Sequence, residues 1–310
     1  MLRRRVYYSI KPYIPWRIRA ALRRVHVRRI RAATHNIWPV NEAAGARPAS
    51  WTGWPENKKF ALILTHDVED QTGLDKCRQL AKLEMELGFR SSFNLIPEGP
   101  YTAPAQLRSW LVENGFEVGI HDHRHDGKLF HSHGGFQKAA RRINQFIQEW
   151  ETKGFRAGFM LRNLDWIHEL DIDYDASTFD TDPFEPQPEG AGTIYPHWIA
   201  TPPGISSKNS GYVELPYTLP QDSTLFLFLE ETTPEIWMRK LDWVAEHGGM
   251  ALINVHPDYI NFDGQVGAKE YPQRHYADLL QYVRQKYAGQ YWHVCAHQLA
   301  SWYRSQLPHQ

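Results

Sequence analysis

Acidic and histidine side chains gather in two short stretches of this chain. The stretch Thr65-His66-Asp67-Val68-Glu69-Asp70 follows an apolar run, and His121 and His125 occur about fifty residues later. A His-x-x-x-His spacing lets two imidazoles meet on one face of a helix. Two neutral nitrogens and one carboxylate hold a catalytic zinc ion while one coordination position stays open for water. These residues therefore predict the site of a metal-assisted hydrolase.

The elements around these residues alternate between strand and helix patterns. Strands are expected at residues 60–64, 92–96, 117–120, 155–159, 174–178, 212–215, 250–255 and 291–295. Helices are expected at residues 74–87, 104–114, 136–150, 163–170, 234–247, 270–287 and 297–305. This alternation predicts a parallel sheet with helical crossovers. A closed barrel and an open doubly wound sheet both fit, and both place chemistry at the carboxyl ends of the strands.

The segment 180–210 has little regular pattern and is long for a connection. Connections of this length are usually binding lids or disordered segments. Its aromatic and acidic residues form a candidate substrate wall, because aromatic rings stack on sugar faces and carboxylates favour an amine product. The candidate substrate-binding residues in this segment are Asp180, Asp182 and Trp198, and a structural lid is the alternative.

Charge is unevenly distributed along the chain. The 310 residues carry 35 Lys and Arg against 35 Asp and Glu. Residues 1–32 contain eleven basic residues and no acidic one, which leaves 24 basic against 35 acidic side chains elsewhere. Ile18, Leu22, Val25 and Ile30 lie among these arginines, as in a basic amphipathic helix that binds an anionic membrane surface. A solvated or partner-docked extension is the alternative, and no nucleic-acid partner is expected.

These patterns divide the chain into a basic arm at 1–38, a linker at 39–57 and a catalytic domain at 58–307. No run of 18 apolar residues occurs, so no transmembrane helix is expected. The N-terminal stretch lacks the clean apolar core of a cleavable signal peptide. Cys77 and Cys295 form no disulfide framework or Cys-x-x-Cys motif. A cytoplasmic protein, peripheral to the inner membrane face, is therefore expected.

Four motifs occur in one order along the chain: Thr65-His-Asp-Val-Glu69, His121-x-x-x-His125, Gly154-Phe-Arg156-Ala and Leu252-Ile-Asn-Val-His256-Pro. In this order they resemble the motifs of the polysaccharide deacetylase family, the NodB-like or carbohydrate esterase 4 type, over residues 58–305. The resemblance implies a distorted (β/α) barrel with about seven strands. It also implies metal-dependent removal of N- or O-acyl groups from sugars. Some relatives cleave other carbon–nitrogen bonds, including cyclic amides.

The resemblance also implies roles for individual residues. Asp67 matches the general base, Arg156 the arginine that pairs with it, and His256 the general acid. Glu214 is a candidate partner that tunes His256. The implied metal ligands are His121, His125 and Glu69, with Asp70 as the alternative carboxylate. The expected cofactor is one divalent ion, with zinc first and cobalt, nickel or iron also compatible with these ligands.

Two positions depart from the family pattern. His66 replaces the usual aromatic residue before the base, and we expect it to contact substrate or the surroundings of the metal. Arg156-Ala157-Gly158 replaces the usual Arg-x-Pro, which leaves the backbone donor for the oxyanion less fixed. The leading prediction is a carbohydrate deacetylase. The alternatives are a hydrolase of a non-sugar linear or cyclic amide and an inactive carbohydrate-binding relative.

Overall fold

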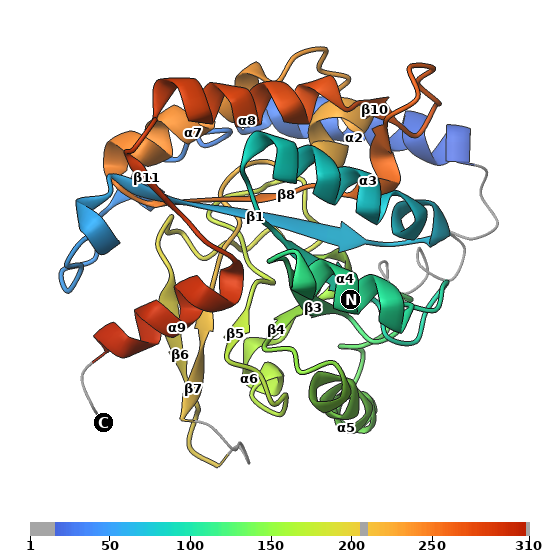
Figure 1. The fold of residues 1–310 in the computed structure, drawn as a ribbon, viewed down its shortest axis with the longest axis vertical. Helices are drawn as coiled ribbons and strands as arrows, with labels where there is room; N and C mark the ends of the chain where they lie inside the picture. Colours follow the sequence, from blue (N-terminus) through green and yellow to red (C-terminus); the bar gives the residue numbers. More distant parts are fainter. Residues whose placement is uncertain (1–15, 205–209, 308–310) are drawn as a thin grey trace.

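The computed structural model describes residues 16–204 and 210–307, and within them it contains the parallel sheet that the sequence predicts (Figure 1). Its parallel strands are β1 Phe60–Val68, β2 Ser92–Leu95, β3 Glu117–His121, β4 Gly154–Arg156, β5 Tyr174–Asp175, β7 Gly211–Glu214, β8 Met250–Asn254 and β11 Tyr291–His293. One further strand of this sheet, β6 His197–Ala200, runs antiparallel to β7. A separate pair is formed by β9 Ile260–Asn261 and β10 Tyr271–Pro272.

The nine-residue strand β1 is the centre of the sheet. It pairs with β8 on one side, and on the other side with β11 at its start and with β2 at its end. From β2 the sheet continues through β3, β4, β5 and β7 to β6. The chain after β7 then meets β8, because the backbone N–H groups of Thr218 and Leu219 donate to the Leu252 carbonyl. The sheet therefore curls into a distorted (β/α) barrel, which confirms the predicted fold.

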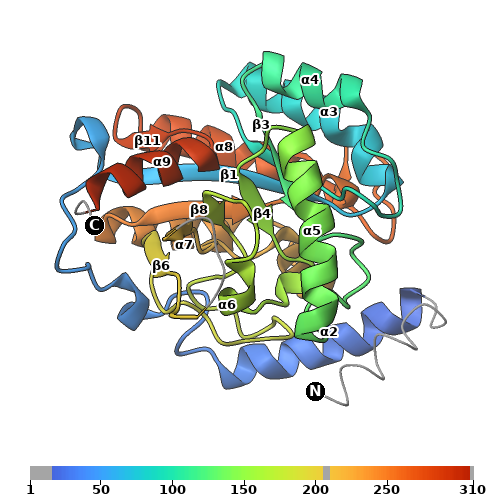
Figure 2. The same cartoon turned by 90° about the horizontal axis from the view of Figure 1, so that it is seen from below.

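Helices surround the curled sheet (Figures 1 and 2). They are α2 Trp16–Ala33, α3 Gln71–Leu87, α4 Ala105–Glu113, α5 His133–Glu149, α6 Leu164–Ile167, α7 Glu235–His247, α8 Arg274–Lys286 and α9 Ala296–Gln306. Shorter turns are η2 Glu42–Gly45, η3 Pro55–Asn57, η4 Gly158–Met160, η5 Ser223–Phe228 and η6 Pro257–Tyr259. The short turns η4, η5 and η6 follow β4, β7 and β8, where the functional side chains are expected.

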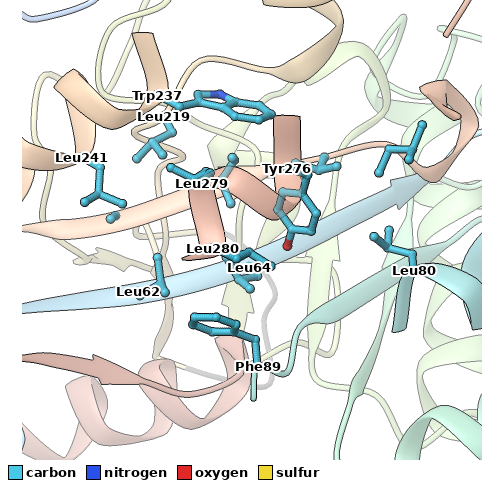
Figure 3. Packing of buried hydrophobic residues seen from close by; sticks show 14 of the residues in the cluster. Leu62, Leu64, Leu80, Phe89, Leu219, Trp237, Leu241, Tyr276, Leu279 and Leu280 are labelled. Carbon is cyan, nitrogen blue, oxygen red and sulfur yellow. The ribbon is translucent and has the colours of Figure 1, made fainter. Parts of the chain in front are cut away.

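Alternation along β1 separates the two sides of the sheet. Leu62 and Leu64 belong to a large core cluster beneath the outer helices, together with Leu279 and Leu280 of α8 (Figure 3). Ala61 and Ile63 belong to a second cluster on the other side of the strand. Burying a leucine side chain stabilises the fold by about 1.5–3 kcal/mol. This packing fixes the register of β1. Because side chains alternate along the strand, Asp67 lies on the same side as Ile63.

Several boundaries differ from the predicted ones in a way that matters for the site. β1 runs to Val68 rather than ending at residue 64, so Asp67 is part of the strand. β4 ends at Arg156, and η4 follows it with Phe159 and Met160 at positive φ. The predicted helix at 163–170 is a single turn, α6. The sequence pattern missed β6 and η5, which have short or irregular hydrophobic spacing.

The segment 39–57, predicted as a linker, packs against the barrel. The Ala44 carbonyl accepts a hydrogen bond from the Ile194 N–H, and Trp54 is buried. Trp51 packs against Trp54 and Tyr195, with ring centroids 4.6 and 4.9 Å apart. These aromatic contacts attach the segment to the barrel. Among the described residues, no helix is both long and apolar enough to cross a membrane, and residues 1–15 lie outside the described part.

Candidate active site

The candidate site lies where β1, β3, β4 and β8 end. β1 contributes Asp67 and, just after its last residue, Glu69. His121 is the last residue of β3, and Arg156 is the last residue of β4. His256 lies two residues after β8. Parallel strands bring their carboxyl ends to one edge, so residues far apart in sequence meet there.

Asp67 is fixed by amide groups from both neighbouring strands. Its Oδ1 accepts a hydrogen bond of 2.8 Å from Nδ2 of Asn94 on β2. Its Oδ2 accepts one of 2.8 Å from Nδ2 of Asn254 on β8. The Arg156 guanidinium lies 3.7 Å from the same Oδ2. The carboxylate therefore has one rotamer and a defined direction.

The pKa of Asp67 lies well below its usual range. Burial alone raises this pKa, but the charges of Arg156, His121 and His256 and the Asn94 hydrogen bond outweigh it. The side chain is only 2% exposed, so these charges act with little screening by solvent. Asp67 is therefore an ionised carboxylate inside the site.

Glu69, His121 and His125 converge on one point. One ligand atom from each lies within 4.8 Å of the others. Oε1 of Glu69 is 3.4 Å from Nε2 of His125, and Oε2 accepts a hydrogen bond from the Tyr259 hydroxyl. Burial raises the pKa of Glu69, but the charges of His125 and His256 and the Tyr259 hydrogen bond outweigh burial and lower this pKa to about 2. The third group is thus a carboxylate held in place by a tyrosine.

The orientation of His121 fits a metal ligand. Its Nδ1 lies 3.2 Å from the Arg156 carbonyl oxygen, which can only accept, so Nδ1 carries the proton. Its Nε2 then presents a lone pair, is buried, and has no hydrogen-bond partner among the described residues. A backbone carbonyl is a usual partner for the second ring nitrogen of a metal-bound histidine. The donor set, two imidazoles and one carboxylate, fits a divalent ion.

The two histidines do not meet on a helix, which corrects the expectation from their spacing. α5 begins only at His133, and residues 122–132 form a loop. Within it Asp122 and His125 have φ of 57° and 53°, in the left-handed region. The His125 ring then stacks on Phe159, with centroids 4.2 Å apart. A strained loop, not helical periodicity, brings the second imidazole back to the first.

Gly158 makes room for this loop. A Cβ atom there would lie 2.3 Å from Oδ2 of Asp122 and 2.8 Å from Cδ2 of His125. The Asp122 and His125 side chains thus occupy the space that the side chain of a proline at position 158 would need. The N–H of Ala157 donates to Oγ of Ser177 at 2.8 Å. This backbone donor is therefore already engaged within the protein.

His256 is held by an aspartate that the sequence did not single out. Its Nδ1 lies 2.6 Å from Oδ1 of Asp222, and its backbone N–H donates to Oδ2 at 2.8 Å. Burial lowers the pKa of His256, but Asp222, Glu69 and Asp67 raise it to about 10. Its Nε2 faces the cluster, 3.9 Å from Oε1 of Glu69. The imidazolium therefore presents its free N–H to the site.

Glu214 is not the partner of His256, which corrects the predicted assignment. Its Oε1 accepts hydrogen bonds from the backbone N–H and the hydroxyl of Thr178. Burial and the neighbouring Asp175 raise the pKa of Glu214 well above its usual value. Glu214 therefore belongs to a buried carboxyl pair behind the site.

Other predicted residues also lie elsewhere. Asp70 caps α3 by accepting from the N–H groups of Thr72 and Gly73. His66 points to the opposite side of β1 from Asp67, is fully buried and bonds to Glu84, so it does not contact substrate.

The three substrate-wall candidates do not reach the site either. Asp180 is buried and paired with Lys240 at 2.5 Å. Asp182 is buried and accepts from the Tyr217 hydroxyl at 2.8 Å. Trp198 packs on the second core cluster beside Arg304. Asp180 and Asp182 therefore stabilise the packing of the 180–210 segment, which corresponds to the structural alternative.

Comparisons with known proteins identify the fold. No model of a protein family matches the sequence, and no curated protein matches it. Among solved structures, a "putative polysaccharide deacetylase" from Mycobacterium smegmatis aligns with a TM-score of 0.61 and 20% identity, covering 85% of this chain and 97% of that one. The two chains share a fold. In this chain the candidate site lies at the strand ends of the shared fold.

Two further solved structures align less closely. The peptidoglycan deacetylase PdaC from Bacillus subtilis has a TM-score of 0.42 and 13% identity, over 80% of this chain and 94% of that one. BA3943, a carbohydrate esterase 4 pseudoenzyme from Bacillus anthracis, has 0.46 and 13%, over 79% and 66%. The fold assignment rests on the first comparison alone.

Proposed function

We propose that this chain is a metal-dependent hydrolase of the polysaccharide deacetylase family that removes acyl groups, chiefly N-acetyl, from a carbohydrate or glycan precursor. The observation that carries the proposal is the convergence of Glu69, His121 and His125 within 4.8 Å. Beside this cluster lie Asp67, whose pKa is held low by neighbouring charges, and His256, whose pKa is raised, which suits a general base and a general acid. The shared fold and the order of the four motifs support the same assignment.

In this proposal Glu69, His121 and His125 hold one divalent ion, zinc first among the candidates. When bound, such an ion lowers the pKa of water to about 7 and polarises a carbonyl. Cobalt, nickel and iron are compatible with the same ligands. Asp70, the alternative carboxylate, is occupied as the cap of α3.

The roles of the other residues follow from their positions. Asp67 accepts the proton of the attacking water, and the Asn94 and Asn254 amides keep its carboxylate oriented. Arg156 keeps this carboxylate ionised until the proton arrives. His256 delivers a proton from Nε2 to the departing amine. Asp222 holds the other nitrogen, Nδ1, so that only Nε2 faces the reaction.

The first test is the metal content of the purified chain, measured with the His121→Ala/His125→Ala variant. We expect about one ion per chain in the wild type and its loss in the variant. A His131→Ala/His133→Ala variant removes two exposed histidines near the same loop and is expected to keep the ion. A folded wild-type chain that stays free of metal after reconstitution would overturn the proposal.

Acetate release from N-acetylated sugar oligomers is the second test. Release that disappears in the Asp67→Asn variant, with metal content unchanged, supports the proposed base. Turnover of a linear or cyclic amide without any release from sugars would move the assignment to the non-sugar alternative. We also propose a cytoplasmic location.

A further inference from the structure

The basic helix α2 packs against the barrel with one face. Val27 is fully buried and Ala20 is 4% exposed. The Arg24 Nε donates to the Leu227 carbonyl of η5 at 3.1 Å. Ile30, expected on the same surface as Leu22, instead packs on the main core cluster. The helix is therefore a docked part of the molecule with a defined inner face.

An acidic pair after η5 fixes how this helix is rotated. Arg24 and Arg28 reach the Glu230 carboxylate at 3.0 and 2.7 Å, and Arg31 reaches Glu231 at 2.6 Å. Exposed ion pairs of this kind contribute little to stability. Their effect here is on orientation, because three arginines of one helix are drawn to one side. The opposite side of α2 then faces away from the barrel.

That outer side is apolar. At about 100° per residue, Ile18, Leu22 and Val25 fall in one narrow sector, opposite Val27. They are 54%, 64% and 50% exposed. Elsewhere in the described chain, the only large hydrophobic residues classed as exposed are two isolated valines. Figure 2 shows α2 along the edge of the molecule, outside the sheet and its other helices. Three adjacent exposed apolar side chains on one helix mark a binding surface.

The charge around this surface selects its partner. Residues 1–32 hold eleven basic residues and no acidic one, and the exposed Arg29 falls in the same sector as Leu22. A second copy of the chain would bring two such faces together, and α2 contains no acidic residue that could pair with Arg29. A bilayer with anionic lipids accepts both the apolar stripe and the positive charge of Arg29 beside it.

We propose that the outer face of α2, formed by Ile18, Leu22 and Val25, binds the surface of membranes that contain anionic lipids. The helix lies in the plane of the interface while its arginine-rich inner face stays on the barrel. α2 contacts η5, which begins directly after Asp222, the partner of His256. The proposal does not depend on the proposed reaction.

Vesicle flotation with the full chain tests this proposal. We expect binding to phosphatidylcholine vesicles with about 30 mol % phosphatidylglycerol and little binding to phosphatidylcholine alone. Binding should fall when salt rises from about 0.1 to about 0.5 M. An Ile18→Ser/Leu22→Ser/Val25→Ser variant should bind at least about tenfold more weakly. A Val112→Ser variant, which removes an exposed valine on α4, should bind as the wild type does.

Circular dichroism and thermal melting confirm that each variant is folded, so loss of binding reports on the surface itself. No binding of the wild type to either vesicle overturns the proposal, as does equal binding by the triple variant. Light scattering adds a third outcome. A stable dimer that the triple variant abolishes would assign the face to a second copy instead. Metal content is measured on the same samples, so failure here is distinguished from failure of the proposed hydrolase.

Discussion

Nδ1 of His256 lies 2.6 Å from Oδ1 of Asp222, although 34 residues separate them in the chain. The same carboxylate accepts the His256 backbone N–H and the Tyr271 hydroxyl through Oδ2. Asp222 therefore fixes both the ring and the backbone of the proposed acid. Asp222 immediately precedes η5, so the position of this short turn controls the direction of the His256 Nε2 proton.

The first prediction concerns this pair. Asp222→Asn replaces an oxygen that accepts from Nδ1 with a group that can donate to it, so the wrong tautomer becomes available. We expect kcat/KM for acetate release to fall by about 100-fold. Tyr271→Phe keeps the carboxylate and should cost less than about tenfold. Both variants should bind the metal ion as the wild type does, and equal activity of Asp222→Asn and wild type would contradict the role.

The second prediction concerns Gly158. In Gly158→Ala the new Cβ meets Asp122 and His125 at 2.3 and 2.8 Å, so the ligand loop must shift. We expect a loss of about 1–3 kcal/mol in the free energy of unfolding. Metal affinity should also fall by about tenfold or more. Gly134→Ala is the matched control, because nothing lies within 4 Å of its Cβ position. Equal metal affinity in the two variants would show that the loop adapts.

The third prediction separates the two candidate carboxylates. Glu69→Gln removes the ligand oxygen that faces His125, and we expect metal affinity to fall by at least about 100-fold. Asp70→Ala removes the cap of α3 and should cost about 1 kcal/mol of stability with metal affinity unchanged. Calorimetric titration with zinc and thermal melting measure the two effects. The reverse pattern would make Asp70 the ligand.

The sequence predicted the barrel and brought the right motifs together, because strand ends of a parallel sheet meet at one edge. It missed Asn94 and Asn254, although each is a polar residue next to apolar residues in a buried strand, which was the available signal. It assigned Glu214 rather than Asp222 to His256. His256 lies close to Asp222 because of the position of η5, a turn without a clear periodic pattern. The sequence therefore contains no local sign of this pairing.

His66 shows a different limit. Its place in the motif suggested a role in the site, but alternation along β1 sends it to the face opposite Asp67. There its Nδ1 lies 2.9 Å from the Val255 carbonyl and its Nε2 2.8 Å from Oε1 of Glu84. The carbonyl can only accept, so Nδ1 carries a proton. A second hydrogen bond joins Nε2 to Oε1 of Glu84. The histidine is thus one half of a buried polar pair behind the strand.

The last prediction tests this pair through the pH dependence of stability. Burial raises the pKa of Glu84, but the charge of His66 and hydrogen bonds from His66, Ser91 and Tyr276 lower it below its ordinary value of 4.5. A depressed carboxyl pKa stabilises the folded state above the unfolded pKa, and this stabilisation is lost as pH falls through the folded value. We therefore expect the wild type to lose stability steadily below about pH 4.5.

Glu84→Gln should lower the free energy of unfolding at neutral pH by about 3–5 kcal/mol, because it leaves His66 buried without its partner. Its stability should also decline less steeply with acid than that of the wild type. Glu86→Gln, an exposed glutamate on the same helix, should change stability by less than about 0.5 kcal/mol. Urea unfolding at pH values between about 3 and 7 measures all three chains. Parallel acid profiles of Glu84→Gln and wild type would show that the pair is not ionised in the folded protein.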